Sequence, residues 1–378
     1  MPKKNEYKFV DLFAGCGGLS VGLQQAGFTP WFVNEIVEQF CNTYKFNHNL
    51  SDEHYFVGDI ADLNAHIDEY KEMLSDITLV CGGPPCQGFS MANRQRILDD
   101  PRNALYKQYL IFLKTVRPKF FIMENVKGMM NKIDEIKQNF TEYLGEEYQF
   151  DYALLRAQDY GVPQNRERFI MIGNRVGVSP KKIFEEIYKH KRPSFVLKDA
   201  LIGLPHLVAK KEKGSKDIEN AESGFTECDF SYIHNDFYKF INGDKEITKL
   251  YNHKNRYNNE RDIEIYRRLP QGANSLHESI ADIMPYKRRN DIFKDKYFKL
   301  EEDKVCKTIT SHMKFDCNMY IHPWEARGLS PREAARIQTF PDDYVITGSQ
   351  NMWYAQVGNA VPVKLAKAIG DGIMKFIK

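Results

Sequence analysis

Short apolar runs recur through the first half of the chain, and a glycine, a cysteine or an acidic residue stands at or just after the end of each. They cover residues 9–13, 30–34, 55–58, 77–80 and 120–123, and helical patterns separate them. Buried strands that alternate with helices are typical of a doubly wound, mostly parallel α/β sheet. In such sheets the residues that follow the strands gather at one edge, where ligands bind. The pattern therefore predicts both a fold class and the place of its chemistry.

The first apolar run leads into a glycine-rich turn, Ala-Gly-Cys-Gly-Gly, at residues 14–18. Such a turn lets a ligand approach the backbone, and the following helix offers free N–H groups. It is neither a G-x-G-x-x-G fingerprint nor a P-loop, which a lysine would complete. Glu35 follows the next run, 17 residues after Gly18, and Asp59 follows the third. A carboxylate about 20 residues beyond such a turn binds ribose hydroxyls. These three strand ends predict a nucleoside site, and the alternative is a tight connection with solvated acids.

Cys86 follows the fourth run within the stretch Cys-Gly-Gly-Pro-Pro-Cys-Gln-Gly-Phe-Ser, residues 81–90. Glycine and proline stop the strand, since proline lacks an N–H and has a fixed φ. Cys86 then sits on a stiff turn at the reactive edge, where its thiolate would be a nucleophile. The alternative is a structural cysteine in a turn. The polar segment 88–103 holds Arg94, Arg96 and Arg102 and is a candidate lid with side chains for phosphate.

Two further strand ends carry charged residues. Glu124 directly follows four large apolar residues, and a carboxyl group that is partly desolvated there holds a proton more readily. Arg166 and Arg168 lead into the apolar run 169–172, and period-two spacing places both on the face opposite Glu167. Arginine seldom enters a strand without a group to bind. If this strand runs antiparallel to the others, its start lies at the same edge as Glu124.

Composition narrows the class of protein. The 378 residues are 42% hydrophobic and 28% charged, which suits a globular chain of two domains or one domain with an insertion. Seven cysteines without metal-binding spacing predict reduced thiols inside the cell and no metal site. The start has no signal-peptide pattern, and no apolar run reaches membrane-spanning length. Because the net charge is only +2, a nucleic-acid partner needs a local basic surface.

The middle of the chain, residues 194–346, lacks regular alternation. Between Tyr251 and Asn290 there are eight Lys or Arg and five Asp or Glu, interleaved with Tyr, Asn and Gln. This mixture suits contacts to phosphates and base edges, and the alternative is a solvated charged surface. Arg332, Glu333 and Arg336 are predicted to brace this part of the chain rather than to contact a substrate.

Several of these pieces occur together in one known family. They are residues 11–18 (DLFAGCGG), 34–35 (NE), 58–60 (GDI), 83–90 (GPPCQGFS), 124–126 (ENV), 164–168 (QNRER), 330–341 (SPREAARIQTFP) and 356–362 (QVGNAVP). In this order the chain resembles the cytosine-5 DNA methyltransferases of bacterial restriction–modification systems, which use S-adenosylmethionine. The resemblance covers roughly the first 175 residues and the last 50. It implies a Rossmann-like methyltransferase domain (1–193), a smaller irregular target-recognition domain (194–346) and a C-terminal segment (347–378) that returns to the first domain.

The resemblance also implies roles for single residues. Cys86 would add to carbon 6 of a cytosine so that carbon 5 accepts the methyl group. Glu124 would donate to ring nitrogen 3 and hold the exocyclic amino group. Arg168 would bind the carbonyl oxygen, with Arg166 close by. The implied cofactor-binding residues are Phe13, Gly15, Cys16, Gly17, Gly18, Glu35, Ile36, Asp59, Ile60, Pro85, Leu105, Asn359 and Val361. The candidate DNA contacts are Gln87, Ser90, Arg94, Arg96, Arg256, Arg261 and Arg288.

A cytosine inside a duplex cannot present carbon 6 to a thiolate, so base flipping is expected. The implied partner is double-stranded DNA, with a separate cognate restriction endonuclease, and the enzyme is expected to act as a cytoplasmic monomer with no membrane contact. Three alternatives stay open: a tRNA cytosine-5 methyltransferase of the same family, a catalytically silent DNA-binding relative, and a nicotinamide oxidoreductase. The last lacks its fingerprint and leaves Cys86 unexplained. The sequence does not give the DNA site that is recognised.

Overall fold

The computed structural model describes residues 7–85, 105–212, 218–285 and 295–377. The chain forms two compact units. The first unit comprises Met1–Tyr160, Glu167–Arg192 and Val361–Lys378, and the second comprises Gly161–Arg166 and Pro193–Ala360. Within the described residues no helix is long and apolar enough to cross a membrane.

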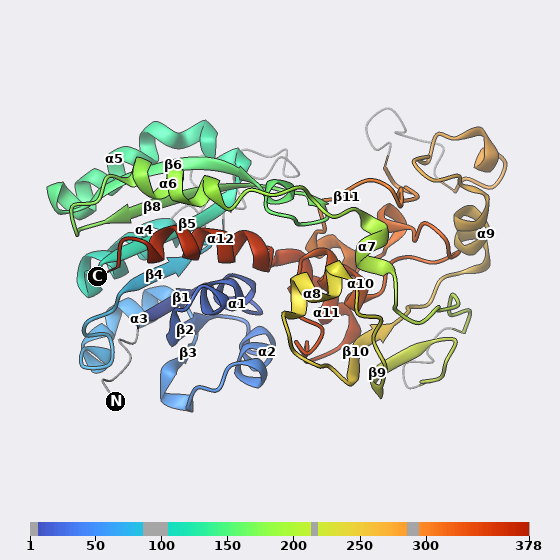
Figure 1. Cartoon of the computed structure of the whole chain (residues 1–378), viewed down its shortest axis with the longest axis horizontal. Coiled ribbons are helices and arrows are strands. Elements are labelled where there is room, and N and C mark those ends of the chain that lie inside the picture. Colours follow the sequence, from blue (N-terminus) through green and yellow to red (C-terminus); the bar gives the residue numbers. More distant parts are fainter. Residues whose placement is uncertain (1–6, 86–104, 213–217, 286–294, 378) are drawn as a thin grey trace. The chain divides into compact units, whose positions relative to one another are not determined.

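The first unit is built on a seven-stranded sheet, as counted over the described residues (Figure 1). Its strands are β1 (Lys8–Leu12), β2 (Thr29–Glu35), β3 (Tyr55–Val57), β4 (Leu79–Gly82), β5 (Phe120–Val126), β6 (Gln149–Arg156) and β8 (Glu167–Asn174). Their order is β3-β2-β1-β4-β5-β8-β6. The pairs from β3 to β5 are parallel, and β8 runs antiparallel to both β5 and β6. The predicted doubly wound, mostly parallel sheet is confirmed. The antiparallel direction of β8 meets the condition under which its start lies at the edge of Glu124.

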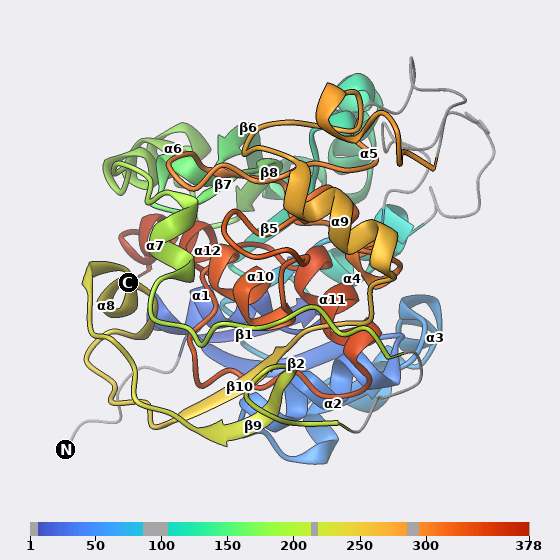
Figure 2. The same ribbon diagram turned by 90° about the vertical axis from the view of Figure 1, so that its right-hand side faces the viewer.

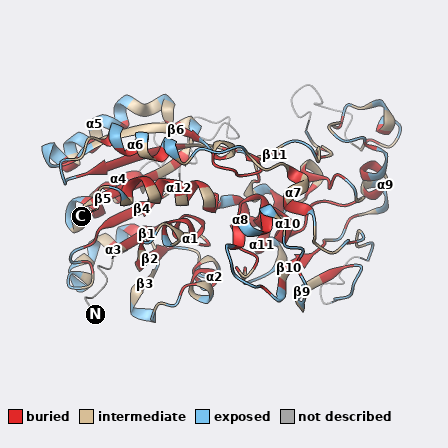
Figure 3. Cartoon of the chain, in the orientation of Figure 1, coloured by how far each residue is buried: buried red, intermediate tan, exposed pale blue. Residues whose placement is uncertain are grey.

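Helices cover both faces of this sheet. Figure 2 shows α1, α6 and α12 on one side and α3, α4 and α5 on the other. The helices of this unit are α1 (Gly18–Gln25), α2 (Glu38–Asn47), α3 (Ile60–Ala65), α4 (Leu105–Val116), α5 (Ile133–Leu144), α6 (Pro180–Lys189) and α12 (Val363–Met374). Because both faces are covered, the central strands are mostly apolar, and β4 is buried at every position (Figure 3).

One strand boundary differs from the sequence-based expectation. Strand β4 begins at Leu79 and continues to Gly82, so the first glycine of the turn still belongs to the strand and the break comes at Gly83. Glycine can join a strand at its end without interrupting the backbone pairing, which explains this difference. Between β5 and β6 the chain forms a 3₁₀ helix, Lys127–Lys132, and then α5.

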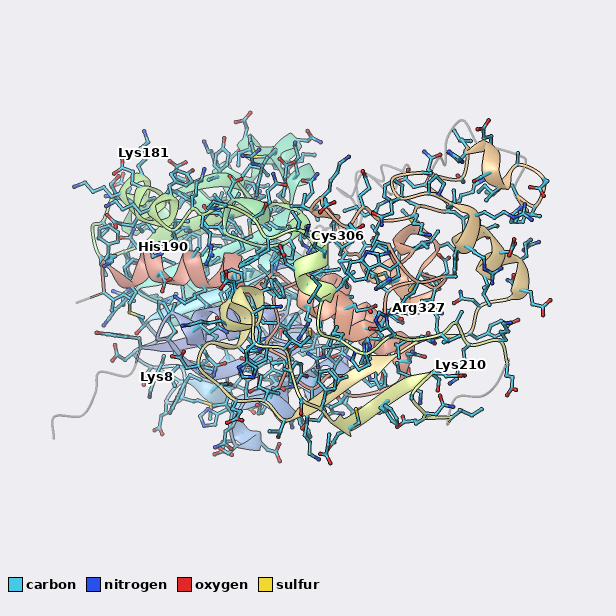
Figure 4. All side chains as sticks on the ribbon, turned by 45° about the vertical axis from the view of Figure 1, so that its right-hand side comes forward. Lys8, Lys181, His190, Lys210, Cys306 and Arg327 are labelled. Carbon is cyan, nitrogen blue, oxygen red and sulfur yellow. The ribbon has the colours of Figure 1, made fainter. Side chains whose placement is uncertain are left out.

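The C-terminal helix α12 packs directly on α1. A Cβ atom on Gly22 would lie 2.4 Å from the Cβ of Ala366, so only glycine permits this approach. Helix α12 also packs against α6. Just after α6, Nδ1 of His190, which is labelled in Figure 4, lies 3.7 Å from Oδ2 of Asp371 on α12. The last residues of the chain therefore close one face of the first unit.

The second unit is irregular and holds short elements. They are β7 (Gln164–Asn165), α7 (Leu197–Leu201), β9 (Gly224–Asp229), α8 (Asp236–Asn242), β10 (Lys249–Lys254), α9 (Glu260–Arg268), β11 (Cys306–Lys307), α10 (Pro331–Ile337) and α11 (Gln350–Asn359). Strands β9 and β10 pair antiparallel, and β7 pairs parallel with β11.

Buried arginines hold the second unit together. Arg336 makes two hydrogen bonds of 2.8 Å to the carboxylate of Asp342. Arg332 donates to the backbone carbonyls of Tyr251, Pro341 and Tyr344. Glu333 accepts two hydrogen bonds from Arg327, which is labelled in Figure 4. The prediction that Arg332, Glu333 and Arg336 brace this part of the chain is confirmed.

Candidate active site

The parallel strands of the first unit bring five chain segments to one edge of the sheet. The backbone registers pair Leu12 with both Asn34 and Gly82, and Gly82 with Met123. Glu35 pairs with Val57 of β3, so the residues at or just beyond these strand ends lie side by side. They are the turn after β1, Glu35, Asp59, Gly83 and Glu124.

The glycine-rich turn adopts a conformation that its sequence favours. Phe13, Gly15 and Gly17 all have positive φ, at 57°, 56° and 81°. Glycine takes up this region without steric cost, so two of the three positions are unstrained. Apart from Gly15 and its two chain neighbours, no atom of the described residues lies within 4 Å of the point where a Cβ of Gly15 would be. The turn thus leaves room for a ligand beside its backbone.

Glu35 ties this turn to the end of β2. Its Oε2 accepts a hydrogen bond of 2.7 Å from the Gly15 N–H, and its Oε1 accepts one of 2.8 Å from the Val37 N–H. Only 6% of Glu35 is exposed, and burial raises the pKa of its carboxyl group while the backbone donors oppose that rise. The next side chain, Ile36, is 62% exposed. A buried acid beside an exposed apolar side chain suits a ligand with hydroxyl groups and a flat ring.

The third strand end adds a second polar position. Asp59 accepts a hydrogen bond of 2.8 Å from the Ala61 N–H and so caps α3. Asn34 donates to the carbonyls of Phe56 and Gly58, which fixes β3 against β2. Among the other predicted cofactor residues of this unit, Cys16, Ile60 and Val361 are buried, Leu105 is half-buried and Pro85 is exposed. Gly18 begins α1.

Sequence reasoning missed a buried polar network beneath this edge. Asp11 accepts a hydrogen bond of 2.5 Å from the Ser20 hydroxyl, and Ser20 accepts one of 2.7 Å from Tyr44. The network joins β1 to α1 and α2, the elements that flank the turn and Glu35. Burial raises the pKa of Asp11 to about 7, although hydrogen bonds from Ser20 and Cys81 lower it. The sequence feature that could have indicated this network is Asp11, an acidic residue within an otherwise mostly apolar strand.

This network predicts a pH dependence of stability. The pKa of Asp11 rises from 3.8 to about 7 on folding, so the folded chain binds this proton more tightly than the unfolded chain. The contribution is complete below about pH 4 and is lost as pH rises through 7, at up to about 4 kcal/mol. We expect Asp11→Asn to flatten the pH dependence of the free energy of unfolding in this range, as measured by urea titration. The control is Asp62→Asn, at an exposed acid on the first turn of α3, which should leave the pH dependence of the free energy of unfolding unchanged. The assignment would be contradicted if Asp11→Asn showed the same pH dependence as the parent.

Glu124 and Arg168 form an ion pair where β5 ends and β8 begins. The Arg168 Nε lies 2.6 Å from Glu124 Oε1, and the two side chains are only 12% and 13% exposed. The antiparallel register pairs Val126 with Arg168, which brings the guanidinium back to the edge that carries Glu124. Burial lowers the pKa of Arg168, and the neighbouring carboxylate opposes this. The expected meeting of these two residues at one edge is confirmed.

The end of β4 is fastened to the end of β5. Asn125 is buried and donates a hydrogen bond of 2.9 Å to the carbonyl of Pro84, two residues before Cys86. Cys86 itself, with Gln87, Ser90, Arg94, Arg96 and Arg288, lies outside the described residues. Their predicted roles therefore stay predictions.

Arg166 differs from its expected place. It lies outside β8, in the break between β7 and β8, so the period-two argument that put it on one face with Arg168 was wrong. It belongs to the second unit, where its guanidinium donates to the carbonyls of Ile309, at 2.6 Å, and Gly358, at 3.2 Å. These contacts give it a bracing role, and a catalytic role for Arg166 stays a prediction.

Other candidates also lie in the second unit. Arg256 donates to the carbonyls of Met313, Lys314 and Phe315 and stacks over Tyr354. Arg261 is exposed on the first turn of α9, and Asn359 is exposed at the end of α11. The contacts of Arg256 are internal to the unit, whereas the exposure of Arg261 leaves it accessible to a partner. Within the described residues no cluster of His, Cys, Asp or Glu is arranged to hold a metal ion.

Comparison with known proteins agrees with this geometry. The family model described as C-5 cytosine-specific DNA methylase matches residues 7–375, nearly the whole chain. The chain belongs to this family. It is a DNA cytosine-5 methyltransferase, and its methyl donor is S-adenosylmethionine.

Relatives of this methyltransferase match it over almost its full length. The Type II methyltransferase M.DdeI of Desulfomicrobium norvegicum is 32% identical, over 98% of this chain and 89% of the relative. M1.HphI of Haemophilus parahaemolyticus is 31% identical, over 97% and 87%. The crystal structure of a putative DNA modification methyltransferase from an E. coli prophage has a TM-score of 0.74 at 26% identity and covers 98% of this chain and 99% of that one.

The residues at the sheet edge fit the methyl donor of this methyltransferase. The carboxylate of Glu35, held at the Gly15 N–H of the turn, is of the type that binds ribose hydroxyls in such sheets. The exposed side chain of Ile36 offers an apolar surface for a purine ring. The glycines leave the backbone of the turn open to close approach by a ligand.

Proposed function

We propose that this enzyme methylates carbon 5 of one cytosine, flipped out of a specific duplex DNA sequence, through a covalent bond to Cys86. The observation that supports this most is the buried pair of Glu124 and Arg168, 2.6 Å apart on adjacent strand ends. The same edge holds the Pro84 turn that leads to Cys86. An acid and a guanidinium beside the turn that leads to a cysteine suit addition to a pyrimidine ring.

The proposed chemistry divides among the residues as follows. The Cys86 thiolate forms a bond to carbon 6 and drives electrons toward carbon 5. Glu124 donates to ring nitrogen 3, and Arg168 binds the carbonyl oxygen as negative charge develops there. When bound, S-adenosylmethionine would supply an electrophilic methyl group to carbon 5, and its sulfonium sulfur would leave as a neutral thioether. A base then takes the carbon 5 proton, and expulsion of the Cys86 thiolate restores the aromatic ring.

In this proposal Glu35 binds the ribose hydroxyls of the donor. Ile36, Asp59 and Ile60 contact its adenine ring. Phe13 and the glycine turn bind its methionine and nucleoside region. Asn359, Val361, Pro85 and Leu105 complete the set. The enzyme is proposed to act as a cytoplasmic monomer on double-stranded DNA. Residues 194–346 would recognise the target, with Arg261 among the contacts, because an exposed arginine is free to meet phosphate.

Replacing Glu35 tests the donor site. In Glu35→Gln an amide nitrogen replaces one acceptor oxygen, so a charged hydrogen bond to a hydroxyl or to an N–H of the turn is lost. We expect the dissociation constant for S-adenosylmethionine, measured without DNA, to rise about 10- to 100-fold. Glu38→Gln, an exposed acid on the first turn of α2, is the matched control and should bind as the parent does. Equal affinities in both variants would contradict the assignment of Glu35.

The relatives are named Type II methyltransferases, and we propose that this enzyme likewise protects host DNA against a separate endonuclease. The test is to produce the chain in a host without cytosine-5 methylation and to sequence its bisulfite-treated DNA. We expect protection of one cytosine in one short sequence. Labelled methyl transfer to DNA and to tRNA should be measured side by side, and labelling of tRNA alone would overturn the proposal.

A further inference from the structure

Gly83 lies directly beneath the carboxyl group of Glu124. A Cβ atom built on Gly83 would be 2.8 Å from Glu124 Oε2, closer than the 3.4 Å at which ordinary contacts of a Cβ begin. The other carboxylate oxygen of Glu124 is the one that meets Arg168. The carboxyl group is therefore held between a guanidinium and the bare backbone of Gly83.

The backbone of Gly83 does not itself require glycine. Its φ lies outside the positive range in which other residues are strained. A side chain at this position would meet the end of the Glu124 side chain first, since the next nearest atoms, the Glu124 carbonyl oxygen and carboxyl carbon, lie at 3.7 and 4.0 Å. The carboxyl group can retreat from an added methyl group without a backbone shift, so the cost in stability is small.

We infer that Gly83 is a positioning residue for the methyl transfer, because the missing side chain sets where the Glu124 carboxyl group stands. This rests on the role proposed above for Glu124. An added methyl group pushes the carboxyl group by several tenths of an ångström, away from the point at which it meets Arg168 and the target base. Displacements of this size at a reacting group lower rates steeply, by about 10²-fold for 1 Å.

Gly82 offers a contrast one residue earlier. A Cβ on Gly82 would lie 2.7 Å from the carbonyl oxygen of Leu12 and 3.2 Å from Tyr109. Backbone of the neighbouring strand cannot retreat as a side chain can. Gly82→Ala should therefore lower the thermal midpoint, whereas Gly83→Ala should lower the rate of the reaction.

The experiment compares Gly83→Ala with the parent enzyme in a single turnover at saturating DNA and S-adenosylmethionine. We expect the rate of methyl transfer to fall about 10- to 100-fold. The dissociation constant for S-adenosylmethionine and the thermal midpoint should stay at the parent values. A folded Gly83→Ala that transfers the methyl group at the parent rate would overturn the inference. A lower thermal midpoint together with loss of S-adenosylmethionine binding would also overturn it, because that result would mean that Gly83 is needed only for the fold.

A double variant shows whether the effect passes through Glu124. Glu124→Asp withdraws the carboxyl group by one methylene and leaves space above residue 83. We expect Gly83→Ala to slow Glu124→Asp by less than threefold, because the clash is gone, whereas an equal fall in both backgrounds would overturn the inference. If Glu124→Gln keeps the parent rate, the proposed function fails. If Glu124→Gln is slow and Gly83→Ala is not, only the inference about Gly83 fails.

Discussion

Replacing Cys86 by serine should lower methyl transfer by at least about 10³-fold, because the nucleophile of the reaction is lost. A serine hydroxyl ionises far less readily than a thiol at neutral pH, so it does not add to carbon 6 of the ring. The measurement is transfer of a labelled methyl group to duplex DNA in a single turnover. Binding of S-adenosylmethionine should stay at the parent level, since Glu35 and the glycine turn are unchanged.

Cys228→Ser is the matched control for this variant. Cys228 is a half-buried cysteine on β9 of the second unit, outside the sheet edge described above. It should retain full activity, which separates the loss of one thiol from general sensitivity to cysteine replacement. Full activity in Cys86→Ser would exclude a covalent mechanism through this residue.

The second large effect is expected at Glu124. Glu124→Gln keeps the size of the side chain but removes the ionisable carboxyl group, and with it both the ability to carry a transferable proton and the ion pair with Arg168. General acid–base groups typically contribute about 10²- to 10⁴-fold to rate, so we expect a fall of that order in the single-turnover rate. The donor affinity should change little, because Glu35 and the turn after β1 hold the donor.

Glu167→Gln provides the comparison for Glu124. Glu167 stands beside Arg168 on β8 and pairs with Lys127, at 2.9 Å, rather than with Arg168. Its replacement should leave the single-turnover rate within about twofold of the parent, as expected of an exposed ion pair. An unchanged rate in Glu124→Gln would mean that the carboxyl group at the end of β5 takes no part in the chemistry.

The sheet and the edge that carries the chemistry were predictable from the sequence because each depends on local pattern. The glycine turn after residues 9–13 and the acids after residues 30–34 and 120–123 show where strands end. Parallel strands that are neighbours in a sheet end at the same edge. The direction of β8 was left open: the sequence indicated only that an antiparallel strand would bring Arg168 to the edge of Glu124.

The remaining contacts depend on partners that sequence spacing does not reveal. Arg166 donates to the carbonyls of Ile309 and Gly358, which are 143 and 192 positions away in the sequence. Its spacing of two from Arg168 therefore did not predict where its side chain binds. Asp11 and Tyr44 meet through Ser20 only after α1 and α2 fold back on the sheet. Gly83 looked like part of a turn, and its closeness to Glu124 emerged only from the register of β4 with β5.

The central claim is that the Cys86 sulfur bonds to the ring of a flipped cytosine, and trapping that bond tests it most directly. The enzyme is incubated with S-adenosylmethionine and a duplex that carries 5-fluorocytosine at the methylated position, then run on a denaturing gel. Fluorine cannot leave as a proton does, so the adduct should persist as a protein–DNA band that Cys86→Ser fails to form. Absence of this band from the parent enzyme, while it still methylates the unfluorinated duplex, would contradict the account.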